Sequence, residues 1–130
     1  MPDTRLKSIK VVAVDDNADG RALLKVILKL SSAEAAVVGS GQEALRAIKK
    51  VHPDILICDL AMPEMDGYQL LETVRRLGPA FRSLSAIAFT AASSNEDRAA
   101  TRRAGFQEHL VKPVAPDELV AAILKVVKGL

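Results

Sequence analysis

The sequence has few aromatic residues and a single cysteine, and these shortages exclude several classes of protein. It holds no Trp, one Tyr and three Phe, too few to stack the bases of single-stranded nucleic acid. The one cysteine, Cys58, lies inside an apolar run, which is typical of a buried thiol in a reducing compartment. The net charge is only +2 and the basic residues are scattered, so no nucleic-acid-binding surface is indicated.

Long apolar segments are also missing. The first apolar run begins at Ile9 and is interrupted by Asp15 and Asp16, so it is too short to span a bilayer or to form a secretory signal. We therefore expect a cytoplasmic protein, or a cytoplasmic module of a longer one, that contacts neither membrane nor nucleic acid. At 130 residues the chain can form one domain with its own core, which we place at about residues 9–128.

Short apolar runs alternate with stretches of helical spacing along the whole chain. The predicted strands cover residues 9–14, 35–39, 55–58, 86–89 and 108–111. The first helix is capped by Asn17 or Asp19, and the apolar spacing predicts that it faces the core with Leu23, Val26, Ile27 and Leu30. A second helix follows Ser40 and ends at His52-Pro53, and the remaining helices cover residues 67–77, 95–104 and 116–127. The helix at 95–104 offers mainly alanines to the core, which predicts a weakly anchored element.

Five strand–helix units joined by short loops predict an α/β fold. The expected architecture is a flavodoxin-like, doubly wound parallel sheet of five strands in the order 2-1-3-4-5. In this order the first and third strands are neighbours. The carboxyl ends of all five strands lie along one edge of the sheet, where ligands bind in such folds.

Polar residues follow four of these strands. Asp15 and Asp16 end the first, Asp59 the third, Thr90 the fourth and Lys112 the fifth. Alone, each has an ordinary explanation, as a helix cap, a turn residue, a strand-end hydroxyl or a surface lysine. Together they would meet at one spot, and carboxylates held close together cost energy unless a cation or a phosphate joins them. The coincidence therefore favours a functional site.

The same residues resemble the receiver domain of two-component response regulators. That family has an acidic pair after the first strand, the frame D-x-x-M-P after the third, Thr or Ser after the fourth and Lys-Pro after the fifth. Here these are Asp15-Asp16, Asp59-Leu60-Ala61-Met62-Pro63, Thr90 and Lys112-Pro113, and Met65-Asp66-Gly67 follows. The resemblance covers residues 10–127. The stretch 105–114 further resembles receivers attached to hybrid histidine kinases.

The resemblance implies that Asp59 accepts a phosphoryl group from a phosphohistidine on a partner kinase, and that this switches a protein-interaction surface. The protein would be a signalling receiver that assists only its own phosphorylation and dephosphorylation. A covalently linked kinase or output domain is a further partner that the resemblance allows. His109 stands where the family usually has the Tyr or Phe that acts with Thr90 as a switch.

Phosphoryl transfer between a carboxylate and an anion requires a divalent cation. Mg²⁺ prefers oxygen ligands, and Mn²⁺ can substitute for it. We expect Asp16, Asp59 and the carbonyl of Ala61 as direct ligands and Asp15 as a ligand through water. Lys112 would pair with Asp59 at rest and with the phosphoryl group afterwards, and the Thr90 hydroxyl would donate to a phosphoryl oxygen.

Two alternatives belong to other classes of protein. A phosphatase of the haloacid dehalogenase type also uses an Asp nucleophile and Mg²⁺, but it has Asp-x-Asp after its first strand, whereas the acids here are adjacent. A phosphorylation-independent scaffold would usually have lost one of the acids or the lysine, and this sequence keeps them all.

Overall fold

Five strands and five α-helices alternate along residues 2–130, the part of the chain that this computed structural model describes. The strands are β1 (Lys10–Val14), β2 (Glu34–Val38), β3 (Ile55–Asp59), β4 (Ser85–Thr90) and β5 (Glu108–Val111). The helices are α1 (Ala18–Leu30), α2 (Gly41–Val51), α3 (Gly67–Arg75), α4 (Asn95–Ala104) and α5 (Pro116–Lys128), and a 3-10 turn, η1 (Pro79–Phe81), precedes β4. Across these residues no helix has the length and apolar content needed to cross a membrane.

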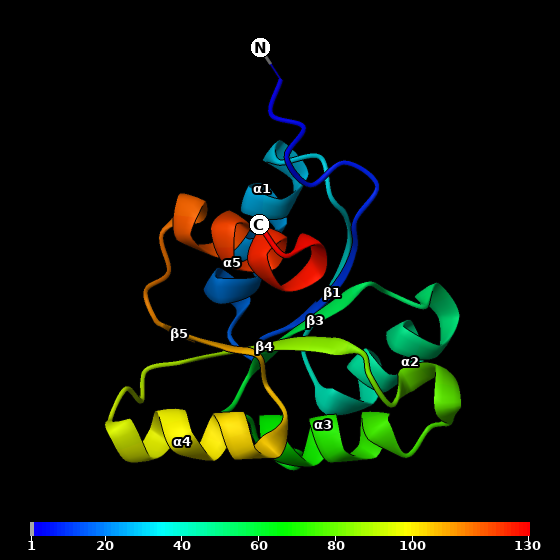
Figure 1. Cartoon of the computed structure of the whole chain (residues 1–130), viewed down its shortest axis with the longest axis vertical. Helices are drawn as coiled ribbons and strands as arrows, with labels where there is room; N and C mark the ends of the chain where they lie inside the picture. The colour runs from blue at the N-terminus through cyan, green and yellow to red at the C-terminus, as the bar shows by residue number, and fades with distance from the viewer. Residues whose placement is uncertain (1) are drawn as a thin grey trace.

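The strands form one parallel sheet in the order β2-β1-β3-β4-β5, which confirms the predicted flavodoxin-like topology (Figure 1). Val14 at the end of β1 lies beside Cys58 of β3, and Asp59 lies beside Phe89 of β4. Thr90 in turn lies beside Val111 of β5. This register brings the polar residues that follow these strands to one edge of the sheet.

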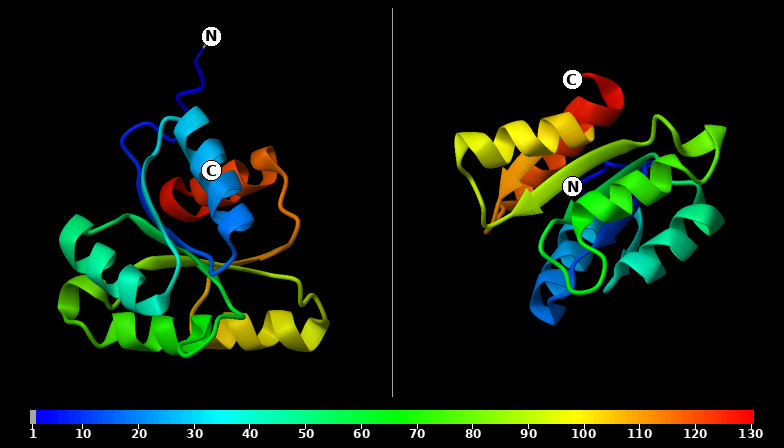
Figure 2. Two further views of the ribbon diagram at one scale, coloured as in Figure 1. Left: turned by 180° about the vertical axis from the view of Figure 1, so that it is seen from behind. Right: turned by 90° about the horizontal axis from the view of Figure 1, so that it is seen from below.

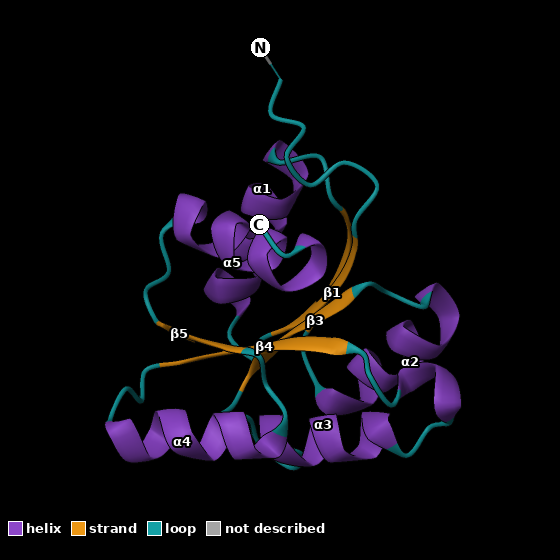
Figure 3. Cartoon of the chain, in the orientation of Figure 1, coloured by secondary structure: helices purple, strands orange, loops and turns teal. Residues whose placement is uncertain are grey.

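Helices cover both faces of the sheet (Figures 2 and 3). On one face α1 and α5 pack against alternate strand residues such as Val11, Ile57 and Ile87, and on the other α2 and α3 pack against the intervening residues such as Val12 and Leu56. All five residues of β3 are buried. A strand covered on both faces must be apolar throughout, which is why its sequence is continuous rather than alternating.

Helix α1 packs with a different face from the predicted one. Leu24, Ile27 and Leu28 are buried, whereas Leu23, Val26 and Leu30 are 49%, 53% and 68% exposed. The sequence offers two overlapping apolar stripes on this helix, and spacing alone cannot decide between them. Packing against the sheet and α5 selects one, so three of the four predicted core residues were wrong, and α1 presents large apolar side chains on its outer surface.

Helix α4 is also anchored differently from the prediction. Its alanines at positions 99 and 104 are exposed, and Thr101 is its buried residue. The Thr101 hydroxyl donates to the Arg98 carbonyl at 2.9 Å and lies 3.0 Å from Nδ1 of His109. A polar side chain can be buried when its hydrogen bonds are satisfied in this way.

Candidate functional site

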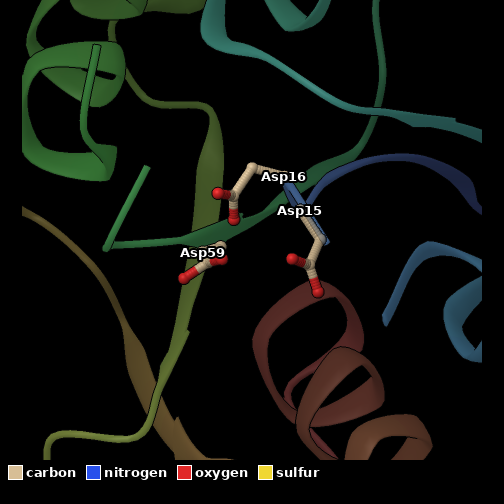
Figure 4. A group of neighbouring side chains, drawn as sticks. All are labelled: Asp15, Asp16 and Asp59. Atoms are coloured by element: carbon tan, nitrogen blue, oxygen red, sulfur yellow. The ribbon is translucent and has the colours of Figure 1, made fainter. Parts of the chain in front are cut away.

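Three carboxylates meet at the carboxyl edge of the sheet (Figure 4). Asp15 and Asp16 follow β1 and Asp59 ends β3, and one carboxylate oxygen of each lies within 4.8 Å of the others. Asp15 and Asp59 are buried, with 1% and 4% exposure, whereas Asp16 is exposed. The predicted acidic cluster is therefore present. Two of its carboxylates are buried and the third is open to solvent.

The β1–α1 loop and the start of α1 hold Asp15 in place. The amide of Asn17 donates to Asp15 Oδ1 at 2.9 Å, and the guanidinium of Arg21 donates to the Asp15 carbonyl at 2.9 Å. A Cβ at Gly20 would lie 2.1 Å from Asp15 Oδ2, so only glycine lets α1 approach this carboxylate. Sequence reasoning missed both Gly20 and Arg21, because nothing in their spacing distinguishes them from ordinary helix residues.

Lys112 supplies the opposite charge. Its Nζ lies 3.1 Å from Asp59 Oδ2 and 3.5 Å from Asp15 Oδ2. The same ammonium lies 4.6 Å from the centre of the Phe89 ring, a cation–π distance. Phe89 was predicted only as a strand residue, and its contact with Lys112 depends on the β4–β5 pairing.

Burial and charge act in opposite directions on Asp59. Removal from water raises the pKa of Asp59 to about 6, and the neighbouring Asp15 contributes to the increase. The ion pair with Lys112 partly offsets this effect. The amide of Ala61 also donates to Asp59 Oδ1 at 3.2 Å, which favours the ionised form. The amide of Ala61 and the ammonium of Lys112 thus hold the carboxylate in position. Together they do not fully offset the cost of burying its negative charge.

The neighbouring Cys58 thiol has a different environment. Burial raises the pKa of Cys58 far above its usual range. Cys58 is buried, as the sequence predicted.

Thr90 and His109 lie on the neighbouring strands. Thr90 is buried at the end of β4, and its hydroxyl accepts a hydrogen bond from the Ala92 amide at 3.3 Å. His109 of β5 is half-buried, with Nε2 2.8 Å from the Ala92 carbonyl and Nδ1 directed to Thr101 of α4. The two predicted switch residues are therefore connected through one residue of the β4–α4 loop, Ala92.

A pocket of about 420 Å³ opens beside the acidic cluster. Its walls are apolar side chains of α1 and α5, including Leu23, Ile27 and Leu119, while Asp15 and Lys112 also line it. The pocket and the charged site are therefore continuous.

The chemistry of this donor set fits two kinds of ligand. Clustered carboxylate oxygens are ligands that Mg²⁺ prefers, and the ammonium of Lys112 can pair with a phosphoryl oxygen. Placed together at the carboxyl edge of a parallel sheet, these groups can bind a cation and an anion side by side.

Comparison with known proteins identifies the family. Residues 11–124 match the family described as the response regulator receiver domain. An uncharacterized 14.6 kDa protein of the sodA1 3' region in Leptolyngbya boryana is 42% identical over 118 residues, covering 91% of this chain and 89% of that protein. Transcriptional regulatory protein PrrA of Mycobacterium tuberculosis is 36% identical over 121 residues, covering 93% of this chain and 51% of PrrA, so the chain spans about half the length of PrrA.

A solved structure shows the same architecture. Vibrio cholerae chemotaxis protein CheY4 matches with a TM-score of 0.85 at 29% identity, covering 91% of this chain and 98% of that one. Family match, relatives, fold and acidic cluster agree: the chain belongs to the response regulator receiver domain family of two-component signalling.

Proposed function

We propose that Asp59 is the phospho-acceptor of this receiver. Its carboxylate oxygen attacks the phosphorus of a phosphohistidine on a histidine kinase, a P–O bond forms, and the P–N bond to the imidazole breaks. The observation that carries this proposal is the position of Asp59, which is buried at the end of β3 between Asp15 and the ammonium of Lys112. A nucleophile of this reaction must be fixed in line with the phosphorus, and the contacts from Ala61 and Lys112 hold this carboxylate.

The acidic cluster fits Mg²⁺, with Mn²⁺ as a substitute. Asp16 and Asp59 would be direct ligands together with the Ala61 carbonyl, and Asp15 would act through water. When bound, the cation supplies positive charge that lets a carboxylate and an anionic phosphoryl group approach. The exposure of Asp16 keeps one side of the cluster open to solvent.

Lys112 and Thr90 would bind the phosphoryl group after transfer. Lys112 already pairs with Asp59, so its ammonium can follow the charge as this moves onto the phosphoryl oxygens. The Thr90 hydroxyl would leave the amide of Ala92 and donate to another phosphoryl oxygen. This movement would begin the switch that passes through His109 to the surface formed by α4, β5 and α5.

The exposed face of α1 is the surface where the phosphodonor domain of the kinase would dock. Leu23 lines the pocket that Asp15 and Lys112 share, and Val26 and Leu30 continue the same apolar face along the helix. Apolar side chains at this spacing form a helix–helix contact surface. A domain seated there would bring its phosphohistidine to the mouth of the acceptor site.

We also propose a linked partner domain, domain bounds and a cellular location for this receiver. PrrA is a transcriptional regulator about twice as long as the matched region, and by analogy an output or kinase domain linked to this receiver is a candidate partner. We further propose that residues 9–128 are the core of one receiver domain and that it works in the cytoplasm. A signalling receiver is favoured over a phosphatase by the family match, and over an inactive scaffold by the complete set of Asp15, Asp16, Asp59, Thr90 and Lys112.

Intact-mass spectrometry tests the acceptor. We expect one phosphoryl group per chain after incubation with acetyl phosphate or a phosphorylated kinase domain, and none in Asp59→Asn or in the presence of EDTA. Asp54→Asn, at a carboxylate that binds the amide of Lys10 away from the cluster, is the control and should be phosphorylated normally. Undiminished incorporation in Asp59→Asn, or in the chelated sample, would overturn the proposal.

A further inference from the structure

His109 joins three elements that the strand order brings together. Its ring is on β5, its Nε2 lies 2.8 Å from the Ala92 carbonyl in the β4–α4 loop, and its Nδ1 lies 3.0 Å from Thr101 Oγ1 on α4. The ring therefore ties the loop that follows Thr90 to the buried residue of α4.

Counting hydrogens shows which form of the ring suits this site. The Ala92 carbonyl can only accept, so Nε2 must carry a hydrogen. Thr101 has one hydroxyl hydrogen and two neighbours that could take it, the Arg98 carbonyl at 2.9 Å and Nδ1. A neutral ring with its hydrogen on Nε2 leaves one of these contacts unmade. In the imidazolium, Nδ1–H donates to Thr101 and Thr101 donates to Arg98, so all three hydrogen bonds form together.

Ala92 carries the effect of this ring toward the acceptor. Its carbonyl accepts from His109 while its amide donates to the Thr90 hydroxyl. If Thr90 turns toward a phosphoryl group, its bond to the Ala92 amide breaks and the loop is released to shift. A tighter bond between His109 and the Ala92 carbonyl opposes that shift, because one residue holds both contacts.

Charged groups around the ring come from several elements. On α4 these are Asp97, Arg98 and Arg102, and on β5 the neighbour Glu108 pairs with Lys125 of α5 at 3.1 Å. The strand β4 (Ser85–Thr90) contributes no charged side chain. Hydrogen bonds from Ser94 lower the pKa of Asp97, and the charge of His109 adds to this effect. Charged side chains of both signs therefore surround the ring. Histidine is the side-chain type that ordinarily changes charge between about pH 5 and 8.

We propose that His109 is a positioning residue whose protonation holds the β4–α4 loop in its resting arrangement, so that proton binding at His109 and phosphorylation at Asp59 oppose each other. The inference rests on the proposed function of Asp59. Coupling of two binding events is reciprocal, so phosphorylation must weaken proton binding by the same factor by which protonation disfavours the phosphorylated state.

Histidine-labelled NMR titrations test the coupling in the native sequence. We expect the midpoint of the His109 titration to move to lower pH when Mg²⁺ and beryllofluoride, a phosphoryl mimic, are added. His52, the second histidine, lies against Phe81 of η1 and is the internal control, with an unchanged midpoint. An unmoved His109 midpoint in a sample whose Asp59 amide shows beryllofluoride binding would overturn this inference alone. Absence of beryllofluoride binding at every pH would instead contradict the proposed function.

A matched variant isolates the contribution of the ring. His109→Gln keeps a side-chain N–H that can donate to Ala92 but does not titrate. Asp59 itself makes beryllofluoride binding pH-dependent in both proteins, so the difference between them is the readout. Between about pH 8 and pH 6 the affinity should fall about fivefold further in the native protein than in His109→Gln. Equal pH profiles in the two proteins would contradict the coupling.

Discussion

The ionised form of Asp59 that phosphoryl transfer would need is the form that destabilises the folded protein. The carboxyl is buried among groups that compensate its charge only in part, and its pKa is raised to about 6. An unfolded chain would release this proton at about pH 4. Between these two values the folded, metal-free protein binds the proton more tightly than the unfolded chain does. Stability attributable to Asp59 is therefore lost as the pH rises from about 4 to about 6, and the loss is complete above that range.

This difference in pKa predicts that removing the charge of Asp59 stabilises the fold by an amount that depends on pH. In EDTA at about pH 7.5, Asp59→Asn should raise the free energy of unfolding by roughly 2 kcal/mol, because an amide never ionises. The gain should disappear at about pH 3, where the Asp59 carboxyl is protonated in both the folded and the unfolded state. Urea unfolding at several pH values measures it. Asp19→Asn, at an exposed carboxylate on α1, should change much less, and an equal gain at both pH values would contradict the explanation.

At the scale of elements, α1 has two distinct apolar faces. Its inner face, Leu24, Ile27 and Leu28, belongs to the core, while its outer face leaves Leu23, Val26 and Leu30 in solvent beside the acceptor site. Exposed apolar side chains gathered in this way mark interaction surfaces. The helix can therefore be altered on its outer face without loss of the fold.

The docking role proposed for α1 predicts that phosphorylation by a kinase domain and by a small phosphodonor will respond differently to mutation of this helix. Leu23→Ser combined with Val26→Ser should slow transfer from the kinase domain at least about fivefold, because buried apolar contacts at an interface contribute upwards of 1 kcal/mol. Phosphorylation by acetyl phosphate should stay unchanged, since a small donor needs no docking surface. Ala22→Ser, also exposed on α1, is the matched control. Equal slowing with both donors would assign these residues to the site itself.

At the scale of the whole molecule, the acidic cluster would couple cation binding to folding. Asp15 and Asp16 come from β1 and Asp59 from β3, so the cluster exists only when the two strands pair. A ligand that binds only the folded state stabilises it by mass action. Conversely, without a cation the three carboxylates repel one another.

Mg²⁺ should therefore stabilise the fold. At ten times its dissociation constant the gain should be about 1.4 kcal/mol. Asp16→Ala should abolish the gain at millimolar Mg²⁺, because a direct ligand is lost, while Asp15→Ala should weaken it less. Thermal unfolding across a Mg²⁺ titration measures both. Greater loss in Asp15→Ala than in Asp16→Ala would reverse the proposed roles of these carboxylates.

Strand order and the site residues could be predicted because they depend on patterns that lie within short stretches of chain. Continuous apolar runs such as Ile55–Cys58 indicate strands buried on both faces, and short crossovers restrict their order. Polar residues directly after those runs, such as Asp59 and Lys112, must then lie at one edge of the sheet. The sequence accordingly predicts that Asp15, Asp59 and Lys112 are neighbours, and Lys112 Nζ lies 3.5 Å from Asp15 Oδ2 and 3.1 Å from Asp59 Oδ2.

Other features depend on which faces meet after folding. The apolar residues of α1 suit two orientations, and only contact with the sheet and α5 selected Leu24 and Leu28 over Leu23 and Leu30. The closeness of Gly20 to Asp15 likewise arises from the position of a whole helix. The sequence by itself determined the order of the elements and the residues at the strand ends, because periodicity is local. The tertiary structure decided the orientation of α1 and the link from His109 through Ala92 to Thr90, because these depend on distances between segments far apart in the chain.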